Sequence, residues 1–177
     1  MNQDVTEVFI GVGSNLSDPE YQVRQAFKAL QALPETQWGA ASDLYHSRPQ
    51  GPQNQPDFVN AVVRLKTRLT PIALLRALQR IEREQGKVKQ RHWGERLIDL
   101  DILLYGNTTL QTDDLIIPHP FMAQRDFVLL PLLALSPKAA LPNGVLLADL
   151  AKQLDEVFVK PMSADENGGL IPEQLGK

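Results

Sequence analysis

The sequence predicts an α+β fold in which one antiparallel sheet carries two helices on one face. Strand-like apolar runs occur at 8–12 and 58–65, and apolar residues recur at helical spacing in 19–30 and 71–85. Along the chain the segments run strand, helix, strand, strand, helix, strand. This βαββαβ order is that of the split βαβ, or ferredoxin-like, arrangement, which leaves the second face of the sheet available for a ligand.

Cap residues indicate where the first helix begins. Asp18 precedes Pro19, and this pair is typical of a helix start, because aspartate caps free N–H groups and proline fits the first turn. Val23, Phe27 and Leu30 then fall on one face of the helix. The pattern predicts that this face packs on the sheet.

Two strands and a long loop come next. Residues 36–45 alternate weakly between apolar and polar, and 58–65 form another strand-like run. The segment between them, 47–56, contains three prolines and no large apolar side chain. A loop with such restricted backbone angles, longer than a hairpin requires, is often functional.

The second helix and the fourth strand complete the pattern. Apolar residues recur at helical spacing between Pro71 and Gly86, and 97–105 alternates like a strand. The aliphatic content of 97–105 indicates a central strand. A C-terminal extension of one short strand and two helical pieces is predicted at 115–117, 127–135 and 146–154.

A change in composition near residue 155 divides the chain. From Asp155 onward, Pro, Gly, Asp and Glu occur with little periodicity. We expect a single domain of residues 1–154, which is long enough to bury a core. Residues 155–177 are expected to form a C-terminal arm, on the surface or disordered.

The composition excludes several kinds of chemistry. None of the 177 residues is cysteine, which excludes disulfides, iron–sulfur clusters, thiolate zinc sites and a cysteine nucleophile. The net charge of −3 argues against a protein that coats nucleic acid or anionic lipid. No apolar run reaches the roughly 20 residues of a membrane span, and Met1-Asn2-Gln3-Asp4 is unlike a signal peptide. We therefore expect a cytoplasmic protein with no nucleic-acid or membrane partner.

Two carboxylates lie two residues apart in the aliphatic segment 97–105. Asp99 and Asp101 are expected on one face of a strand, because side chains alternate there. Neighbouring anions on a half-buried strand repel each other unless cations neutralise them or the face is wet. The cations are either Arg and Lys side chains in a structural role, or a divalent metal. With oxygen ligands and no cysteine, such a metal would be Mg²⁺ or Mn²⁺.

Basic residues accumulate just before these aspartates. From Arg80 to Arg96 the chain places six of its 18 Lys and Arg residues, with His92 among them. A metal beside clustered cations suits a polyphosphate, because the ions bridge phosphate oxygens and the side chains offset the remaining charge. The pattern indicates a Mg-nucleotide site. The sequence contains neither a Walker loop nor a dinucleotide-binding glycine motif, so side chains and metal would have to hold the nucleotide. The alternative is a solvated helix end and loop.

One enzyme family shares these motifs in the same order. The segment from His92 to Leu103, His-Trp-Gly-Glu-Arg-Leu-Ile-Asp-Leu-Asp-Ile-Leu, resembles the signature of the 6-hydroxymethyl-7,8-dihydropterin pyrophosphokinases of folate biosynthesis. The resemblance covers about 9–154 and implies the ferredoxin-like fold. It also implies transfer of pyrophosphate from ATP to the pterin hydroxymethyl group, with release of AMP. Further matches are Gly13-Ser14-Asn15-Leu16, Gly51-Pro52-Gln53, Phe58-Val59-Asn60-Ala61 and Pro118-His119.

The resemblance also implies roles for individual residues. Asp99 and Asp101 would hold two Mg²⁺ ions on the phosphates of ATP, so that catalysis consists of alignment and charge neutralisation. The residues implied in catalysis are Lys87, Arg96, Asp99 and Asp101. Those implied to contact ATP are Lys87, Lys89, Arg96, Ile102, His119 and Arg125. Those implied to bind the pterin, with Phe58 and Phe127 stacking on it, are Ser47, Pro49, Gln50, Phe58, Asn60, Asp99 and Phe127.

Several positions differ from the pattern of this family. Lys87 and Lys89 stand where arginines are expected, and a lysine offers a point charge instead of a bidentate fork. Asp114 stands where a basic residue can contact the nucleotide. Gln79 and Glu82 also match residues of the second helix of the family. For each of them, a position on the surface and a contact with the nucleotide are both compatible with the sequence.

Two other functions are compatible with the residues themselves. Another Mg-nucleotide-dependent transferase, such as a nucleotidyltransferase, would share the aspartates and cations but would not need Phe58, Asn60 and Phe127 together. A ferredoxin-like nucleic-acid-binding module would need exposed aromatic residues on the sheet and a basic face. The partners expected on balance are the small molecules ATP and the pterin, bound by a monomer.

Overall fold

The computed structural model describes residues 4–16, 18–47, 58–86, 97–154 and 159–162. Six strands of these residues form one antiparallel sheet, and two more form a small pair. The strands of the sheet are β1 (Thr6–Ser14), β2 (Thr36–Ala41), β3 (Leu44–Ser47), β4 (Phe58–Thr67), β5 (Asp99–Tyr105) and β8 (Val159–Met162). The small pair consists of β6 (Leu110–Gln111) and β7 (Ile116–Ile117).

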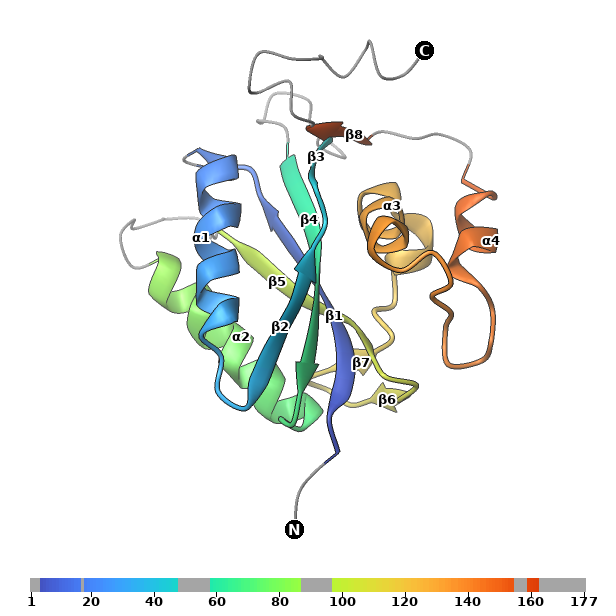
Figure 1. Cartoon of the computed structure of the whole chain (residues 1–177), viewed down its shortest axis with the longest axis horizontal. Helices are drawn as coiled ribbons and strands as arrows, with labels where there is room; N and C mark the ends of the chain where they lie inside the picture. Colours follow the sequence, from blue (N-terminus) through green and yellow to red (C-terminus); the bar gives the residue numbers. More distant parts are fainter. Residues whose placement is uncertain (1–3, 17, 48–57, 87–96, 155–158, 163–177) are drawn as a thin grey trace.

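Helices lie on both faces of this sheet (Figure 1). The first face carries α1 (Pro19–Gln31) and α2 (Pro71–Gly86); the second carries the 3-10 turn η1 (Met122–Gln124), α3 (Asp126–Leu135) and α4 (Leu147–Ala151). The strand order β5-β1-β4-β3 and the order of elements along the chain confirm the predicted ferredoxin-like α+β fold. Among the described residues, no helix combines the length and the apolar character that crossing a membrane requires.

The sequence signals for α1 and α2 are confirmed. The Asp18 carboxylate accepts a hydrogen bond from the Tyr21 N–H at 3.4 Å and so caps the start of α1. On α2 the apolar stripe at helical spacing packs against the sheet. Its buried residues are Leu74, Leu78 and Ile81.

The strand predicted over 36–45 is in fact two strands, β2 and β3, which both pair with β4. Ser42 lies at the break: its N–H donates to the Val62 carbonyl at 2.8 Å, and its hydroxyl accepts from the Val62 N–H at 2.9 Å. Because the hydroxyl replaces a backbone carbonyl, the chain bends without leaving a buried donor unpaired. Beyond the bend, β3 brings the backbone of Ser47 opposite Phe58.

The second face of the sheet is partly covered, contrary to the expectation of a free face. An apolar cluster fills the space between the sheet and the layer of η1, α3 and α4. Phe9 and Val62 enter it from the sheet, and Leu129 and Leu132 from α3. Beside this cluster a pocket stays open over β1, β4 and β5.

β5 lies at one end of the strand order, so the prediction of a central strand is wrong. Its residues are aliphatic because both of its faces are covered. Leu100 and Ile102 pack in the cluster under α1 and α2, whereas Leu103 and Leu104 pack in the cluster under α3. A register shift in the pairing with β1 leaves Leu103 unmatched. Because of this shift, Leu104 lies on the same face of the strand as Leu103 and not on the opposite one.

Part of the segment beyond residue 154 joins the sheet. Val159–Met162 form β8, which pairs antiparallel with β3 from Leu44↔Met162 to Ser47↔Val159. The weak periodicity of the sequence did not predict this strand. The remaining residues, 155–158 and 163–177, lie outside the described residues, and the division into a domain of 1–154 and an arm stays a prediction.

Candidate active site

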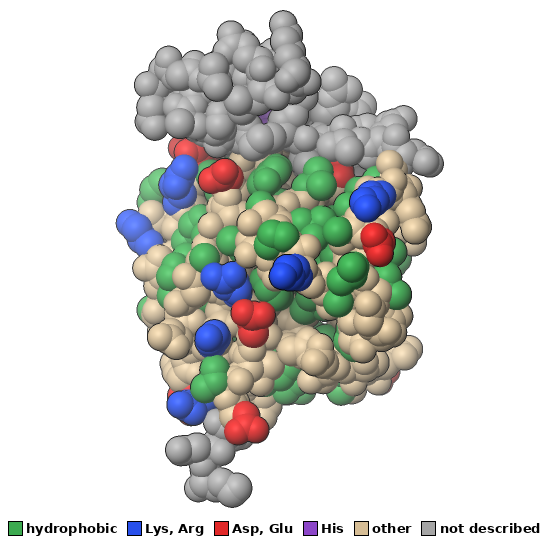
Figure 2. All heavy atoms as spheres, turned by 45° about the vertical axis from the view of Figure 1, so that its right-hand side comes forward, with side chains coloured by type: hydrophobic (Ala, Val, Ile, Leu, Met, Phe, Trp, Pro, Cys, Tyr) green, Lys and Arg blue, Asp and Glu red, His purple; other side chains and the backbone are tan. Residues whose placement is uncertain are grey.

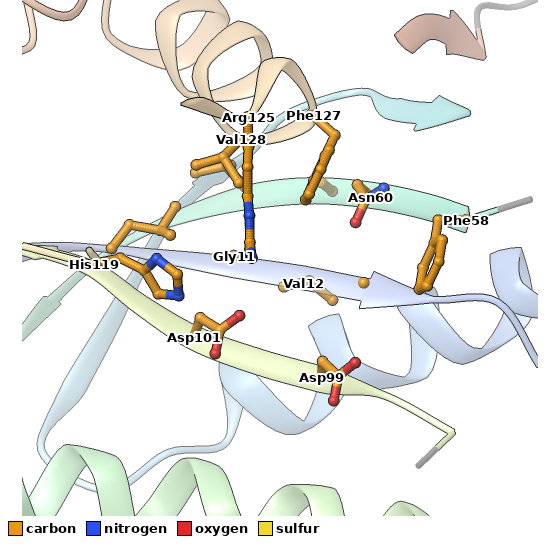
Figure 3. Close-up of a pocket in the computed structure, with 14 residues that line it drawn as sticks. Gly11, Val12, Phe58, Asn60, Asp99, Asp101, His119, Arg125, Phe127 and Val128 are labelled. Atoms are coloured by element: carbon orange, nitrogen blue, oxygen red, sulfur yellow. The ribbon is translucent and has the colours of Figure 1, made fainter. Parts of the chain in front are cut away.

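A pocket of about 280 Å³ opens on the sheet face that carries α3 (Figure 3). Its size is close to the lower end of the range for small-molecule sites, roughly 300–1,000 Å³. β1, β4 and β5 form its floor, and the segment from His119 to Val128 forms its wall. The lining residues are Gly11, Val12, Gly13, Phe58, Asn60, Ala61, Val62, Asp99, Asp101, Leu103, His119, Arg125, Phe127 and Val128.

Asp99 and Asp101 both line this pocket, as their spacing of two residues predicted. Leu100 between them is buried on the opposite face of β5. Across the strand pair, Asp99 lies opposite Gly13 and Asp101 lies opposite Gly11. Because both neighbours on β1 are glycines, β1 itself places no side chain beside the two carboxylates.

A side chain from α2 fixes the backbone between these aspartates. The Glu82 carboxylate accepts a hydrogen bond from the Leu100 N–H, with 2.8 Å between Oε2 and N. In the described part of the chain β5 pairs only with β1, so Leu100 exposes its N–H on the open edge of the sheet. Glu82 therefore satisfies a backbone donor that pairs with none of the described strands.

Asn60 lies deep in the pocket, and Gly13 makes room for it. Asn60 is 8% exposed and pairs with Gly13 across β4 and β1. A Cβ atom on Gly13 would lie 2.6 Å from Asn60 Oδ1, closer than real contacts allow. The glycine is therefore required by the position of the Asn60 amide.

Two phenylalanines lie on either side of Asn60 in the view of Figure 3. Phe58 begins β4, and Phe127 projects from the first turn of α3. Both line the pocket and neither is fully buried, although core packing would bury them. The arrangement provides aromatic faces for a flat ring and an amide that can read its edge.

His119 is fixed by two backbone groups. Its N–H donates to the Leu103 carbonyl at 3.0 Å, and its ring Nδ1 accepts from the Phe121 N–H at 3.2 Å. Burial is the largest cause that lowers the pKa of His119 below its usual value of 6.5; Asp101 acts in the opposite direction, and Arg125 lowers it further. A neutral ring whose Nδ1 accepts carries its proton on Nε2, which makes Nε2 a donor.

Arg125 brings a positive charge to the same wall of the pocket. It precedes α3 and points toward Gly11, between His119 and Phe127 in the view of Figure 3. Its Cζ lies 5.3 Å from the centre of the Phe121 ring and 5.6 Å from that of Phe127. The pocket thus combines two carboxylates on its floor with a guanidinium and an imidazole on its wall.

The donor set of the pocket fits a hard divalent cation that is shared with phosphate. Among the described residues there is no group of three or more His, Asp or Glu side chains that could hold a metal alone. Asp99 and Asp101 offer carboxylate oxygens from one strand. Mg²⁺ is typically bound by one or two carboxylates, with substrate phosphates and water completing the octahedron.

Several residues with predicted roles do not appear in this pocket. Ile102 is buried in the cluster under α1 and α2, so a contact with ATP would have to come from its backbone on the open edge of β5. Asp114 forms an ion pair with Arg76 of α2 at 3.0 Å, on the surface. The predicted site residues that lie outside the described residues are Pro49, Gln50, Lys87, Lys89 and Arg96.

Sequence reasoning missed other parts of the site. Phe121, which meets both His119 and Arg125, is 52% exposed, and its only signal was an aromatic residue close to a candidate phosphate-binding histidine. The sequence comparison with the family gave Glu82 no definite role. In the structure its carboxylate accepts a hydrogen bond from the backbone of Leu100. Both contacts bring together residues that no local periodicity relates.

Fold and pocket together define a ferredoxin-like α+β protein whose small-molecule site combines paired carboxylates, basic groups and aromatic faces. A model of the family 7,8-dihydro-6-hydroxymethylpterin-pyrophosphokinase (HPPK) matches residues 9–137. The chain belongs to this family, which confirms the resemblance seen in the sequence.

Curated relatives agree with the family match. The chain is 49% identical over 153 residues to the 2-amino-4-hydroxy-6-hydroxymethyldihydropteridine pyrophosphokinase of Haemophilus influenzae, covering 86% of this chain and 96% of the relative. It is 48% identical over 146 residues to the protein of the same name from Pseudomonas aeruginosa, covering 82% of this chain and 90% of the relative.

Solved structures share the fold. The chain matches a Plasmodium falciparum HPPK-DHPS with a TM-score of 0.67 at 13% identity, covering 90% of this chain and 49% of that one. An HPPK-DHPS in complex with substrates matches with a TM-score of 0.66 at 13% identity, covering 89% and 46%. The chain therefore spans about half the length of these proteins, and the likeness concerns the fold alone.

Proposed function

We propose that this chain transfers pyrophosphate from ATP to the hydroxymethyl group of 6-hydroxymethyl-7,8-dihydropterin, releasing AMP, in folate biosynthesis. The observation that carries the proposal is one pocket with two chemically different ends. Phe58, Asn60 and Phe127 suit a flat polar ring, while Asp101, His119 and Arg125 suit metal-bound phosphates. Family membership and the names of the relatives support the same reaction.

The reaction needs alignment more than covalent help from the protein. The pterin hydroxymethyl oxygen forms a bond to the β-phosphorus, the bond from that phosphorus to the α,β-bridging oxygen breaks, and the hydroxyl proton is lost to solvent. Phe58 and Phe127 would hold the ring while the Asn60 amide fixes its orientation. A ring held in this way would direct its hydroxymethyl group toward the end of the pocket where Asp101, His119 and Arg125 lie.

Charge neutralisation is the second task of the site. Arg125 and the Nε2–H of His119 would contact phosphate oxygens from the pocket wall. Asp99 and Asp101 would hold two Mg²⁺ ions, which supply charge neutralisation and orientation of the phosphates when bound. From outside the described residues, Lys87, Lys89 and Arg96 are proposed as further phosphate contacts, and Pro49 and Gln50 as backbone contacts to the pterin. Ser47, at the end of β3, is proposed as a third backbone contact to the pterin.

A nucleic-acid-binding module is the alternative that the face shown in Figure 2 and the pocket disfavour. Figure 2 shows acidic and basic side chains interspersed with apolar ones on the face that it presents, instead of a continuous basic field. The two lining phenylalanines lie in a pocket of about 280 Å³, which suits one small ring, instead of on an open sheet face on which successive bases of RNA could stack. We propose that the chain acts on small molecules, as a monomer, since one chain supplies both ends of the pocket.

Analysis of nucleotide products tests this function directly. The protein is incubated with ATP and Mg²⁺, with and without the pterin alcohol, and the nucleotides are separated by chromatography. The proposal predicts AMP in a 1:1 ratio with pterin diphosphate, formed only when both substrates are present. Formation of ADP, or of free pyrophosphate without pterin diphosphate, would instead indicate a kinase or a nucleotidyltransferase.

A further inference from the structure

Phe121 is an exposed apolar side chain beside the candidate active site, and the proposed function does not explain its exposure. It is 52% exposed, although a phenylalanine normally gains most by burial, and it does not line the pocket. It lies between β7 and η1, in the chain segment that forms the pocket wall. Core packing does not account for its position.

Two side chains that meet the Phe121 ring, those of His119 and Arg125, belong to the phosphate end of the pocket. The Arg125 Cζ lies 5.3 Å from the centre of its ring, within the range of a cation–π contact. The His119 ring meets it edge-on, with 6.3 Å between ring centres and 64° between planes. The backbone N–H of Phe121 also donates to His119 Nδ1 at 3.2 Å.

The Arg125 guanidinium lies near two aromatic rings. The second ring is that of Phe127, whose centre lies 5.6 Å from the Arg125 Cζ. A free arginine populates many rotamers, and ordering it on a ligand costs conformational entropy. Two aromatic contacts restrict the guanidinium before any ligand arrives, which removes part of this cost from binding.

We propose that Phe121 is a positioning residue, which orders Arg125 and His119 at the phosphate end of the pocket, the part lined by Asp101, His119 and Arg125, without touching the substrate itself. Phe127 cannot serve as the probe of this role, because it also lines the pocket. Phe121 can, because its own side chain stays outside. The proposal rests on the proposed function only for the identity of the phosphate ligand, ATP.

The placement itself is tested in the ligand-free protein by NMR. Side-chain protons of Arg125 over an aromatic face shift upfield, and this shift should shrink in Phe121→Leu and persist in Phe121→Tyr. Tyr21→Leu is the matched control, since Tyr21 is 54% exposed on α1 and does not line the pocket. An unchanged Arg125 shift in Phe121→Leu would overturn the placement, whatever reaction the protein performs.

The functional consequence is tested by kinetics. Phe121→Leu should raise the KM for ATP about two- to fivefold, the factor expected for a cation–π contact at a wet site, and leave the KM for the pterin unchanged. Phe121→Tyr should restore the ATP value. In an Arg125→Ala background the leucine change should raise the KM for ATP by a smaller factor, because the contact with Arg125 is already lost and only the ring contact with His119 remains. The same fold-change in both backgrounds, or an equal rise for both substrates, would refute the positioning role.

The two proposals fail in distinguishable ways. If no AMP is formed from ATP, the proposed function fails, and calorimetric binding of tripolyphosphate then replaces the KM for ATP in the same cycle. If AMP is formed but Phe121→Leu changes neither the Arg125 shift nor the KM for ATP, the positioning role fails and the proposed function stands.

Discussion

Glu82 on α2 accepts a hydrogen bond from the backbone N–H of Leu100, which separates the two aspartates of the pocket. The contact joins the helix layer to the open edge of β5, where no neighbouring strand is available in the described chain. It fixes the position of the part of β5 whose alternate residues, Asp99 and Asp101, line the pocket. The metal-binding geometry proposed for Asp99 and Asp101 therefore depends on a carboxylate from the opposite side of the sheet.

Removing this acceptor should loosen the strand. Glu82→Ala is expected to lower the free energy of unfolding by about 1–2 kcal/mol and to accelerate amide exchange at Leu100 at least about tenfold. Glu82→Gln keeps an acceptor oxygen and should preserve most of the protection. Hydrogen exchange followed by NMR measures both, and equal protection of Leu100 in the alanine and glutamine variants would contradict this role.

Gly13 should be intolerant of even a methyl group. Gly13→Ala places a Cβ 2.6 Å from Asn60 Oδ1, so the amide has to move, and affinity for the pterin should fall about tenfold. The affinity for ATP should change little, and Asn60→Ala should reproduce the effect. Calorimetry with each ligand separately is the measurement. Gly86→Ala is the control, since a Cβ there meets none of the described atoms within 4 Å.

The two aspartates should be dispensable for folding and required for turnover. Asp99→Asn or Asp101→Asn is expected to reduce turnover at least about a hundredfold, because each removes a charged group proposed to hold Mg²⁺. The unfolding free energy of the metal-free variants should be unchanged or raised, since one of two neighbouring anions is gone. Asp113→Asn, an exposed change of the same charge, is the control. Normal turnover in either site variant would defeat the metal assignment.

His119 should remain neutral somewhat below pH 6.5 in the metal-free protein. Its pKa is lowered in the folded state, chiefly by burial, so the unfolded chain binds a proton at a higher pH than the folded one. As pH falls below about 6.5 toward the folded-state pKa, this residue therefore makes the folded state progressively less stable. Chemical denaturation from pH 7.5 to 5 should give a smaller loss of stability for His119→Gln than for the wild type. Identical slopes would show that burial does not perturb this ring.

Most of the fold is readable in the sequence because it depends on local patterns. The Asp18 cap and the stripes of α1 and α2 are short-range signals, and the order of elements then restricts the topology. Pairing is less readable, because aliphatic content reports burial of both faces and not the number of neighbouring strands. For this reason the aliphatic content of β5 predicts a central strand, whereas among the described strands it lies at the edge of the sheet. The bend at Ser42 depends on a contact with Val62 on β4, which the weak alternation over 36–45 does not reveal.

The site is readable only in part, for a related reason. The spacing of Asp99 and Asp101 predicts one face of a strand, and the structure places both at the pocket. The pterin-binding roles proposed for Phe58, Asn60 and Phe127 come from the family resemblance, because local sequence favours core packing for each phenylalanine. Contacts such as those of Glu82 and Phe121 depend on three-dimensional proximity, which periodicity does not encode.

The central claim is that this pocket moves the β- and γ-phosphates of ATP together onto the pterin. ATP labelled with ³²P at the α- or the γ-position, incubated with Mg²⁺ and the pterin alcohol, tests it most directly. The γ-label should appear in the pterin product and the α-label in AMP. Formation of both labelled products should be lost in Asp101→Asn and retained in Asp113→Asn. An α-label recovered in ADP, or transfer that survives unchanged in Asp101→Asn, would contradict the account.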